Sequence, residues 1–140
     1  PAEPIDVFVI MTGARPAAAV FATIAPDGYN AEIQLLVGIS IDERVMGVRA
    51  VRHRETPGLG DAIDIENSDW IRQFDGKSLA DPVLSLWAVD KDEGAFDSLT
   101  GATVTPRAVV KAVKNTLIYF GAHKDELFAA AHAVADGNEQ

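Results

Sequence analysis

Four short apolar runs fill the first half of this sequence, and they restrict the possible folds more than any other feature. Each run is rich in β-branched residues and is bounded by turn residues, a pattern that is typical of strands. Only a few residues separate consecutive runs, and an antiparallel pair of strands needs no more than a tight turn to join it. We therefore expect an antiparallel meander with strands over 5–11, 17–25, 32–41 and 45–53.

The middle of the chain is expected to be less regular. Pro and Gly residues within 54–60 indicate a loop. Ser68 is expected to cap a short helix that runs through Gln73. A fifth strand is expected over 82–89. Two aromatic residues in these segments are expected to lie in the core: Trp70 and Trp87.

The last third of the sequence is expected to be helical. Thr105 followed by Pro106 is typical of a helix start, because Thr caps helices and Pro fits the first helical position. Apolar residues then recur at helical spacing as far as Phe120. Gly121 is expected to end this helix, and a second helix is expected over 124–135.

The length of 140 residues fits one domain with a single core. The expected fold class is α+β, with an antiparallel meander sheet packed against a few helices over residues 1–140. The net charge of −9 argues against nucleic-acid binding, because backbone phosphates require a basic surface. The absence of cysteine excludes disulfides and thiolate metal sites, and the spacing of the three histidines predicts no metal site.

The most informative polar stretch is DSLTGATVTPR, residues 97–107, which runs directly into the expected helix start. A helix N-terminus offers free N–H groups and a partial positive charge, and both suit a phosphate. Gly101 permits close approach of a ligand, and hydroxyls of Thr100, Thr103 and Thr105 surround that point. The residues alone leave two interpretations open, a phosphate site or a helix cap beside ordinary loop threonines.

The same stretch resembles the flavinylation signature of the FMN-binding domain family, Asp-x-x-Ser/Thr-Gly-Ala-Thr followed by Thr or Ser. Three blocks match the family in order: PDGYNAEIQLLVGIS (26–40), HRETPGLGDAI (53–63) and FDSLTGATVTPRAVVKAVK (96–114). Within the family, the sequence most resembles the G subunits of Rnf ion-translocating electron-transport complexes. The C subunits of Na⁺-translocating NADH:quinone reductases are more distant relatives.

The resemblance implies that FMN is joined through its phosphate to Thr103. In the family, a dedicated flavin transferase makes this link with FAD as the donor. Asp97 would orient the segment for the transferase or hold a metal for it. The remaining signature positions are interpreted as one wall of the cofactor site: Thr100, Gly101, Ala102 and Thr105. The loop 55–60 is interpreted as the second wall, with five contributing residues: Glu55, Thr56, Pro57, Gly58 and Leu59.

The resemblance further implies an electron carrier whose partners are other subunits of a membrane redox complex. No recognisable catalytic set is present, so no catalytic residue is assigned and no substrate chemistry is expected. The sequence starts without Met and holds no run of 18 apolar residues. It is interpreted as a soluble piece of a longer, membrane-anchored protein at the extracytoplasmic (periplasmic) face of a bacterial inner membrane.

Two alternatives stay open at this point. The same FMN-binding module serves other extracytoplasmic reductases or sensors, and a fused catalytic domain would favour that assignment. The chain also fits a cofactor-free binding module, whose working surface would be the acidic stretch 55–98.

Overall fold

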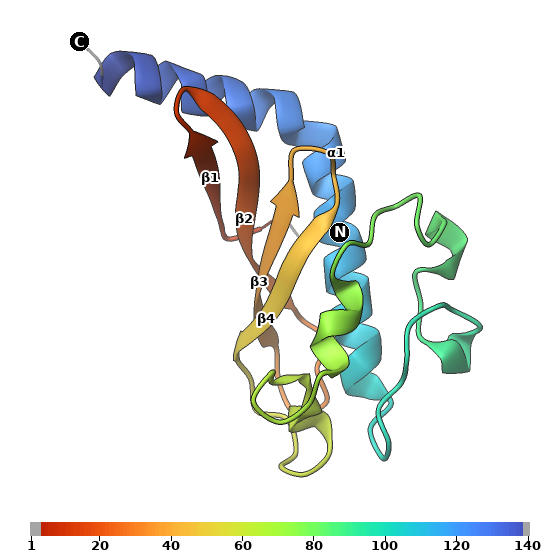
Figure 1. The fold of residues 1–140 in the computed structure, drawn as a ribbon. Helices are drawn as coiled ribbons and strands as arrows, with labels where there is room; N and C mark the ends of the chain where they lie inside the picture. The colour runs from red at the N-terminus through yellow and green to blue at the C-terminus, as the bar shows by residue number, and fades with distance from the viewer. Residues whose placement is uncertain (1–3, 139–140) are drawn as a thin grey trace.

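The computed structural model describes residues 4–138, with side chains as far as residue 133 (Figure 1). Four strands form one antiparallel sheet in the order β1-β2-β3-β4. Their bounds are Asp6–Thr12 for β1, Arg15–Ala25 for β2, Ile33–Ser40 for β3 and Val45–Arg52 for β4. The predicted meander and the α+β class are confirmed, and each strand end lies within two residues of its expected position.

One long helix, α1 (Val104–Asn138), crosses one face of the sheet (Figure 1). Residues alternate along β3 between buried and half-buried, so every second side chain points toward this helix. The Phe21 ring meets the Phe120 ring edge to face, with the centroids 5.6 Å apart. The predicted apolar stripe of the helix is buried against the sheet: Val109, Val113, Leu117 and Phe120.

The two predicted C-terminal helices are a single helix, so the prediction that Gly121 ends the first one was wrong. A glycine inside a helix costs only about 1 kcal/mol relative to Ala, and the neighbouring residues favour helix. Packing continues past it, because Phe128 contacts Phe120 with ring centroids 5.8 Å apart. The glycine lies against the β3–β4 turn, where a Cβ would lie 2.9 Å from Glu43 Oε1 at the flexible end of that side chain.

Between β4 and α1, residues 53–103 contain only four short 3-10 helices: η1 (Gly60–Ile63), η2 (Trp70–Phe74), η3 (Leu84–Leu86) and η4 (Asp90–Asp92). The short helix predicted after Ser68 is present as η2, and the Ser68 hydroxyl accepts a hydrogen bond from the Trp70 amide at 3.0 Å. Both tryptophans are buried, as predicted. They belong to an aromatic cluster with two phenylalanines: Trp70, Phe74, Trp87 and Phe96.

The predicted fifth strand over 82–89 was wrong. This stretch holds η3, and only isolated β-bridges flank it, from Val83 to Ala80 and from Val89 to Phe96. Its main-chain groups bond locally, as when the Trp87 amide donates to the Leu84 carbonyl at 3.1 Å. The stretch is apolar enough for a strand, but it does not lie along an edge of the sheet, and an unpaired strand is not stable.

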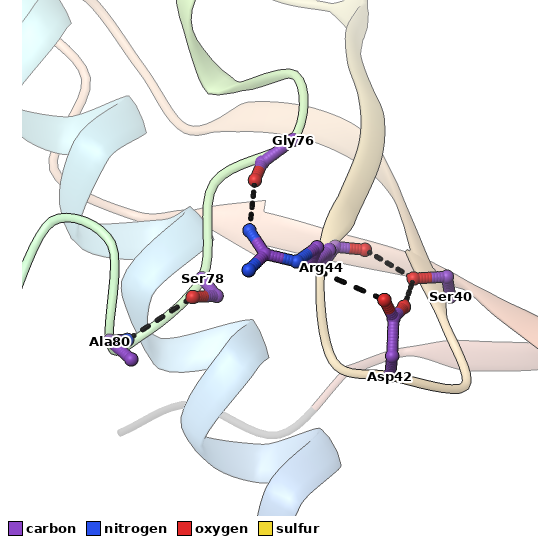
Figure 2. Close-up of polar contacts among 6 residues, drawn as sticks. All are labelled: Ser40, Asp42, Arg44, Gly76, Ser78 and Ala80. Carbon is purple, nitrogen blue, oxygen red and sulfur yellow. Dashed lines mark hydrogen bonds and ion pairs between the residues drawn. The ribbon is translucent and has the colours of Figure 1, made fainter.

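The segment 53–103 is fastened to the sheet at the β3–β4 turn (Figure 2). Arg44 Nη1 donates to the Gly76 carbonyl at 3.0 Å, and the Gly76 amide donates to the Val45 carbonyl at 2.7 Å. Within the turn, the Ser40 hydroxyl donates to Asp42, and this bond lowers the pKa of that carboxyl. These contacts place the middle of the irregular segment beside the edge strand β4.

No helix within residues 4–138 has the length and apolar character that a bilayer crossing requires.

Candidate functional site

A pocket of about 430 Å³ lies at the N-terminal end of α1. One wall comes from the loop before η1 and the other from the segment that enters the helix. The predicted second wall and the predicted signature segment therefore face each other across one cavity, although about 45 residues separate them in sequence. The turn between β2 and β3 supplies the rim. Nine residues line the pocket: Tyr29, Thr56, Leu59, Gly60, Gly101, Ala102, Thr103, Val104 and Thr105.

Thr103 immediately precedes α1, whose first residue is Val104. It therefore occupies the position just outside the helix, next to the N–H groups that have no partner within the helix. Its side chain is half-buried, and its hydroxyl accepts a hydrogen bond from Lys91 Nζ at 3.3 Å. A hydroxyl at this point faces the positive end of a 35-residue helix, which favours a negatively charged substituent.

Thr105 is not the helix cap that the sequence predicts. It is the second residue of α1, and its buried hydroxyl donates to Glu55 Oε1 at 2.7 Å. Pro106 is consequently the third helical residue. This position is also compatible with proline, because the N–H groups of the whole first turn lack helical partners.

The Glu55 carboxylate ties three segments together beneath the pocket. Only 4% of this residue is exposed. Oε1 accepts from the Tyr29 amide at 2.9 Å as well as from Thr105, and Oε2 accepts from the Asn30 amide at 3.2 Å. Hydrogen bonds to a buried carboxylate are stronger than neutral ones, and losing them would leave buried donors unsatisfied. Glu55 therefore fixes the β2–β3 turn and the helix start relative to the loop, and it does not line the pocket.

His53 orients the Glu55 main chain. Its Nδ1 accepts the Glu55 amide at 3.0 Å, so this nitrogen carries no hydrogen, and Nε2 donates to Asp64 Oδ2 at 2.8 Å. The half-buried ring links the end of β4 to the residue that follows η1. His53 thus supports the second wall from behind.

Two glycines allow the walls to approach each other. Gly101 has φ +76, and a Cβ there would lie 2.8 Å from Leu59 Cδ2. A Cβ at Gly60 would lie 2.8 Å from Thr105 Oγ1. Real Cβ atoms do not come this close, so a larger residue at Gly101 would displace the Leu59 methyl group, and one at Gly60 would displace the Thr105 hydroxyl. The Leu59 side chain therefore packs directly on the bare backbone of Gly101.

The structure separates the predicted site residues into three groups. Thr56, Leu59 and the segment 101–103 line the pocket, as does Thr105. Thr100 faces a neighbouring hollow that it shares with Lys91. The residues that do not line the pocket are Glu55 beneath it, the exposed Pro57 and Gly58, and Asp97.

Asp97 has an exposed side chain and a main chain that is held on both sides. Its amide donates to Gln73 Oε1 at 2.7 Å, and its carbonyl accepts from Trp70 Nε1 at 2.7 Å. The aromatic cluster thereby fixes the start of the signature segment. Among the described residues, no group of three potential ligands (His, Cys, Asp or Glu) lies close enough to hold a metal ion.

Sequence reasoning did not identify Tyr29, Val104 and Lys91 as site residues. Tyr29 is 67% exposed at the pocket rim, and it reaches the site only through the Glu55 bond across 26 residues of sequence. Lys91 reaches Thr103 across 12 residues. Tyr29 lies within the first block that carries the family resemblance, and this is the one sequence signal that pointed toward it.

Two other cations near the helix start are paired with acids. Arg107 makes two hydrogen bonds to Asp92, at 2.8 and 2.7 Å. The hydrogen bonding from Arg107 lowers the pKa of Asp92, and the same interaction raises the pKa of Arg107. Lys111 Nζ lies 3.0 Å from Asp27 Oδ2. These pairs tie η4 and the end of β2 to the first turns of α1.

The residues present fit a planar cofactor with a phosphate at one end. The volume lies within the range of small-molecule pockets, and the lining combines an aromatic ring, aliphatic groups, hydroxyls and bare backbone. Leu59 and Tyr29 suit a flat ring system, whereas Thr103 beside the helix N-terminus suits a phosphate. The nine lining residues include no acid–base pair.

A sequence profile of the FMN-binding domain family matches residues 28–118, a range that includes every residue lining the pocket. Several relatives are named as the G subunit of the ion-translocating oxidoreductase complex. The protein from Pseudomonas aeruginosa (strain UCBPP-PA14) is 50% identical over 93% of this chain and 61% of its own length. The relative from Pseudoalteromonas atlantica is 49% identical, over 93% of this chain and 60% of its own length. The relative from Shewanella baltica (strain OS223) is 48% identical, over 91% of this chain and 60% of its own length. The chain thus spans about three fifths of the length of these relatives.

Proposed function

The chain belongs to the FMN-binding domain family, and from this premise we propose that it carries FMN through a phosphoester to Thr103. The observation that carries the proposal is the place of Thr103, where one hydroxyl lies on the pocket wall and at the N-terminus of α1. A phosphate on this oxygen lies at the positive end of the helix. The attached ring lies in the pocket between Leu59 and Tyr29.

Attachment requires a flavin transferase, because a free threonine hydroxyl is a weak nucleophile and its one hydrogen-bond partner among the described residues is the Lys91 ammonium, which is not a base. FAD is the donor. The bond between Thr103 Oγ1 and the flavin-side phosphorus forms, and the phosphoanhydride bond of FAD breaks. AMP leaves with the anhydride oxygen, and the hydroxyl proton passes to a base of the transferase. The exposed Asp97 side chain, on a firmly held main chain, is the feature that the transferase recognises.

The bound flavin makes the domain an electron carrier. FMN supplies one- and two-electron redox chemistry, and the protein holds the ring and sets its environment. A pocket lined without an acid–base pair suits a carrier better than an enzyme that acts on a small substrate. The similarity to G subunits of ion-translocating oxidoreductase complexes supports a place in such a complex, with its other subunits as electron partners. In the full-length protein the domain lies on the periplasmic side of the inner membrane, attached by a membrane anchor.

The test is to produce the full-length protein with and without a flavin transferase and to compare it with Thr103→Ala. We expect flavin to remain on the denatured wild-type protein, and the peptide containing Thr103 to gain the mass of FMN less one water. Thr103→Ala should fold with an unchanged melting temperature and carry no covalent flavin. Thr12→Ala, which changes an exposed threonine that does not line the pocket, is the matched control and should still accept flavin. Wild-type protein that stays colourless beside an active transferase would refute the proposal.

A further inference from the structure

Lys91 is the cation that the fold holds at the Thr103 hydroxyl. Its Nζ lies 3.3 Å from Thr103 Oγ1. The other two cations near the helix start, Arg107 and Lys111, are engaged with Asp92 and Asp27. Among the residues that the structure describes, Lys91 forms no ion pair, and the carboxylate next to it, Asp90, accepts a hydrogen bond from Ser98 instead.

The position of Lys91 is set by contacts on both sides of it in η4. On one side, Asp90 is bound to Ser98, and its amide donates to the Phe96 carbonyl at 2.6 Å. On the other side, Asp92 forms its two hydrogen bonds to Arg107 in the first turns of α1. The turn that carries Lys91 is therefore anchored both to the signature segment and to the helix. A lysine on an unanchored loop would not be held near Thr103 in this way.

A phosphodiester at Thr103 presents two non-bridging oxygens that share one negative charge. The helix N-terminus supplies only partial charge, whereas an ammonium supplies a full charge and three donors. Hydrogen bonds between such a cation and a phosphate are about twice as strong as neutral ones. The chain thus places an ammonium group beside the atom to which the phosphate would be joined, in a hollow that the Asp90 carboxylate also lines.

We propose that Lys91 is the phosphate-binding residue of this site, and that it pairs with a non-bridging oxygen of the phosphoester on Thr103. Lys91 lines the neighbouring hollow together with Thr100 and Gly101, and Gly101 lines the main pocket as well. A phosphate that pairs with Lys91 would therefore leave the main pocket to the ring. This inference rests on the proposed attachment at Thr103.

The experiment compares Lys91→Gln and Lys91→Arg with wild type in the full-length chain, with Lys124→Gln as the matched control. Lys124 lies on α1, 20 positions after its first residue, where it pairs with Glu43 at 3.6 Å and does not line the pocket. Protein made without the transferase is titrated with FMN, and protein made with it is examined by ³¹P NMR. Melting temperatures of all variants check the fold.

We expect Lys91→Gln to weaken FMN binding by the unmodified protein about tenfold, which corresponds to roughly 1.4 kcal/mol. The ³¹P resonance of the phosphoester should shift in the same variant. Lys91→Arg should restore most of the affinity, and Lys124→Gln should match wild type. An unchanged dissociation constant and an unchanged ³¹P resonance in Lys91→Gln would overturn the inference.

The outcomes also separate this inference from the attachment at Thr103. A wild-type protein that never acquires covalent flavin would refute the attachment, and the FMN titration would still decide whether Lys91 binds phosphate. A flavin-loaded wild type beside a Lys91→Gln variant that behaves identically would refute only the role of Lys91.

Discussion

The sheet with its helix and the irregular segment 53–103 are held together by different means. In the sheet and α1, main-chain ladders run the length of each element, and one continuous apolar layer joins them. The irregular segment contains short 3-10 helices. It shares the apolar core with the sheet and α1 through residues such as Ile63, Phe74 and Phe96, but side chains rather than main-chain ladders supply several of its hydrogen bonds. Three of these side chains are Glu55, Trp70 and Trp87.

This difference shows why the pocket lies where it does. A regular sheet and helix provide a rigid reference, but their main-chain groups are already used in ladders. The irregular segment leaves backbone bare at Gly60 and Gly101, and it can therefore approach a ligand closely. The pocket forms at the junction, where Glu55 binds the loop to the helix start.

The largest expected effect comes from removing one buried ring in each region. Phe21→Ala and Phe74→Ala should each cost about 3–5 kcal/mol in free energy of unfolding, because both rings are fully buried. Hydrogen exchange should then differ, since Phe21→Ala weakens the whole molecule, whereas Phe74→Ala should mainly speed exchange within 53–103. Exchange that accelerates equally everywhere in both variants would show that the two regions unfold as one unit.

The next largest effect is expected at the bond between the regions. Glu55→Ala should cost about 1–3 kcal/mol in free energy of unfolding, because it leaves the Tyr29 and Asn30 amides and the Thr105 hydroxyl without their acceptor. Glu55→Gln keeps one acceptor oxygen and should fall between Glu55→Ala and wild type. Chemical denaturation provides the measurement. Glu66→Ala, which removes an exposed carboxylate, is the control and should change little.

A smaller effect is expected from adding a side chain at Gly101, where the two walls of the pocket meet. Gly101→Ala and Gly58→Ala both place a side chain at positive φ, +76 and +79, which costs about 1–2 kcal/mol. Only the alanine at 101 would meet Leu59, whereas a Cβ at 58 has nothing within 4 Å. Both variants should therefore lose similar stability, but only Gly101→Ala should shift the Leu59 methyl resonances and weaken FMN binding. Equal FMN affinity in the two variants would contradict the close contact.

The smallest expected effect concerns the exposed pair between Asp92 and Arg107. Its hydrogen bond lowers the pKa of Asp92 in the folded protein. The resulting stability is present above the ordinary pKa of the carboxyl and is lost as the pH falls through the lowered value. Asp92→Asn should therefore have a slightly lower melting temperature than wild type near neutral pH. This difference in melting temperature should disappear in acid and shrink in high salt. Melting temperatures across acidic pH, at two salt concentrations, provide the measurement.

The strands could be predicted from sequence because their signal is local. Along β3, alternate side chains face the helix, and this period of two is visible in the residues themselves. The predictions failed where the outcome depended on distant partners. An apolar run at 82–89 forms no strand without a neighbouring edge. Gly121 does not end the helix, because Phe128 beyond it packs on Phe120 before it.

The candidate site was also predictable only where its sequence signal is local. The signature segment was identified by its resemblance to a family and by its position before a helix. Lys91 and Tyr29 were missed, because only the folded chain brings η4 and the β2–β3 turn to the pocket. Thr105 was predicted to cap the helix, because no local sequence signal shows that its hydroxyl donates instead to Glu55, 50 residues away in sequence.

The course of the uninterrupted helix α1 has a consequence for contacts with other molecules. Its 35 residues follow about 50 Å of helix axis at 1.5 Å per residue, and Thr103 lies just before its first residue. Figure 1 shows that this axis bends, so the C-terminal turns run in a different direction from the turns beside the pocket. A contact made by the C-terminal turns would therefore hold the domain at a distance from the pocket and leave the pocket open.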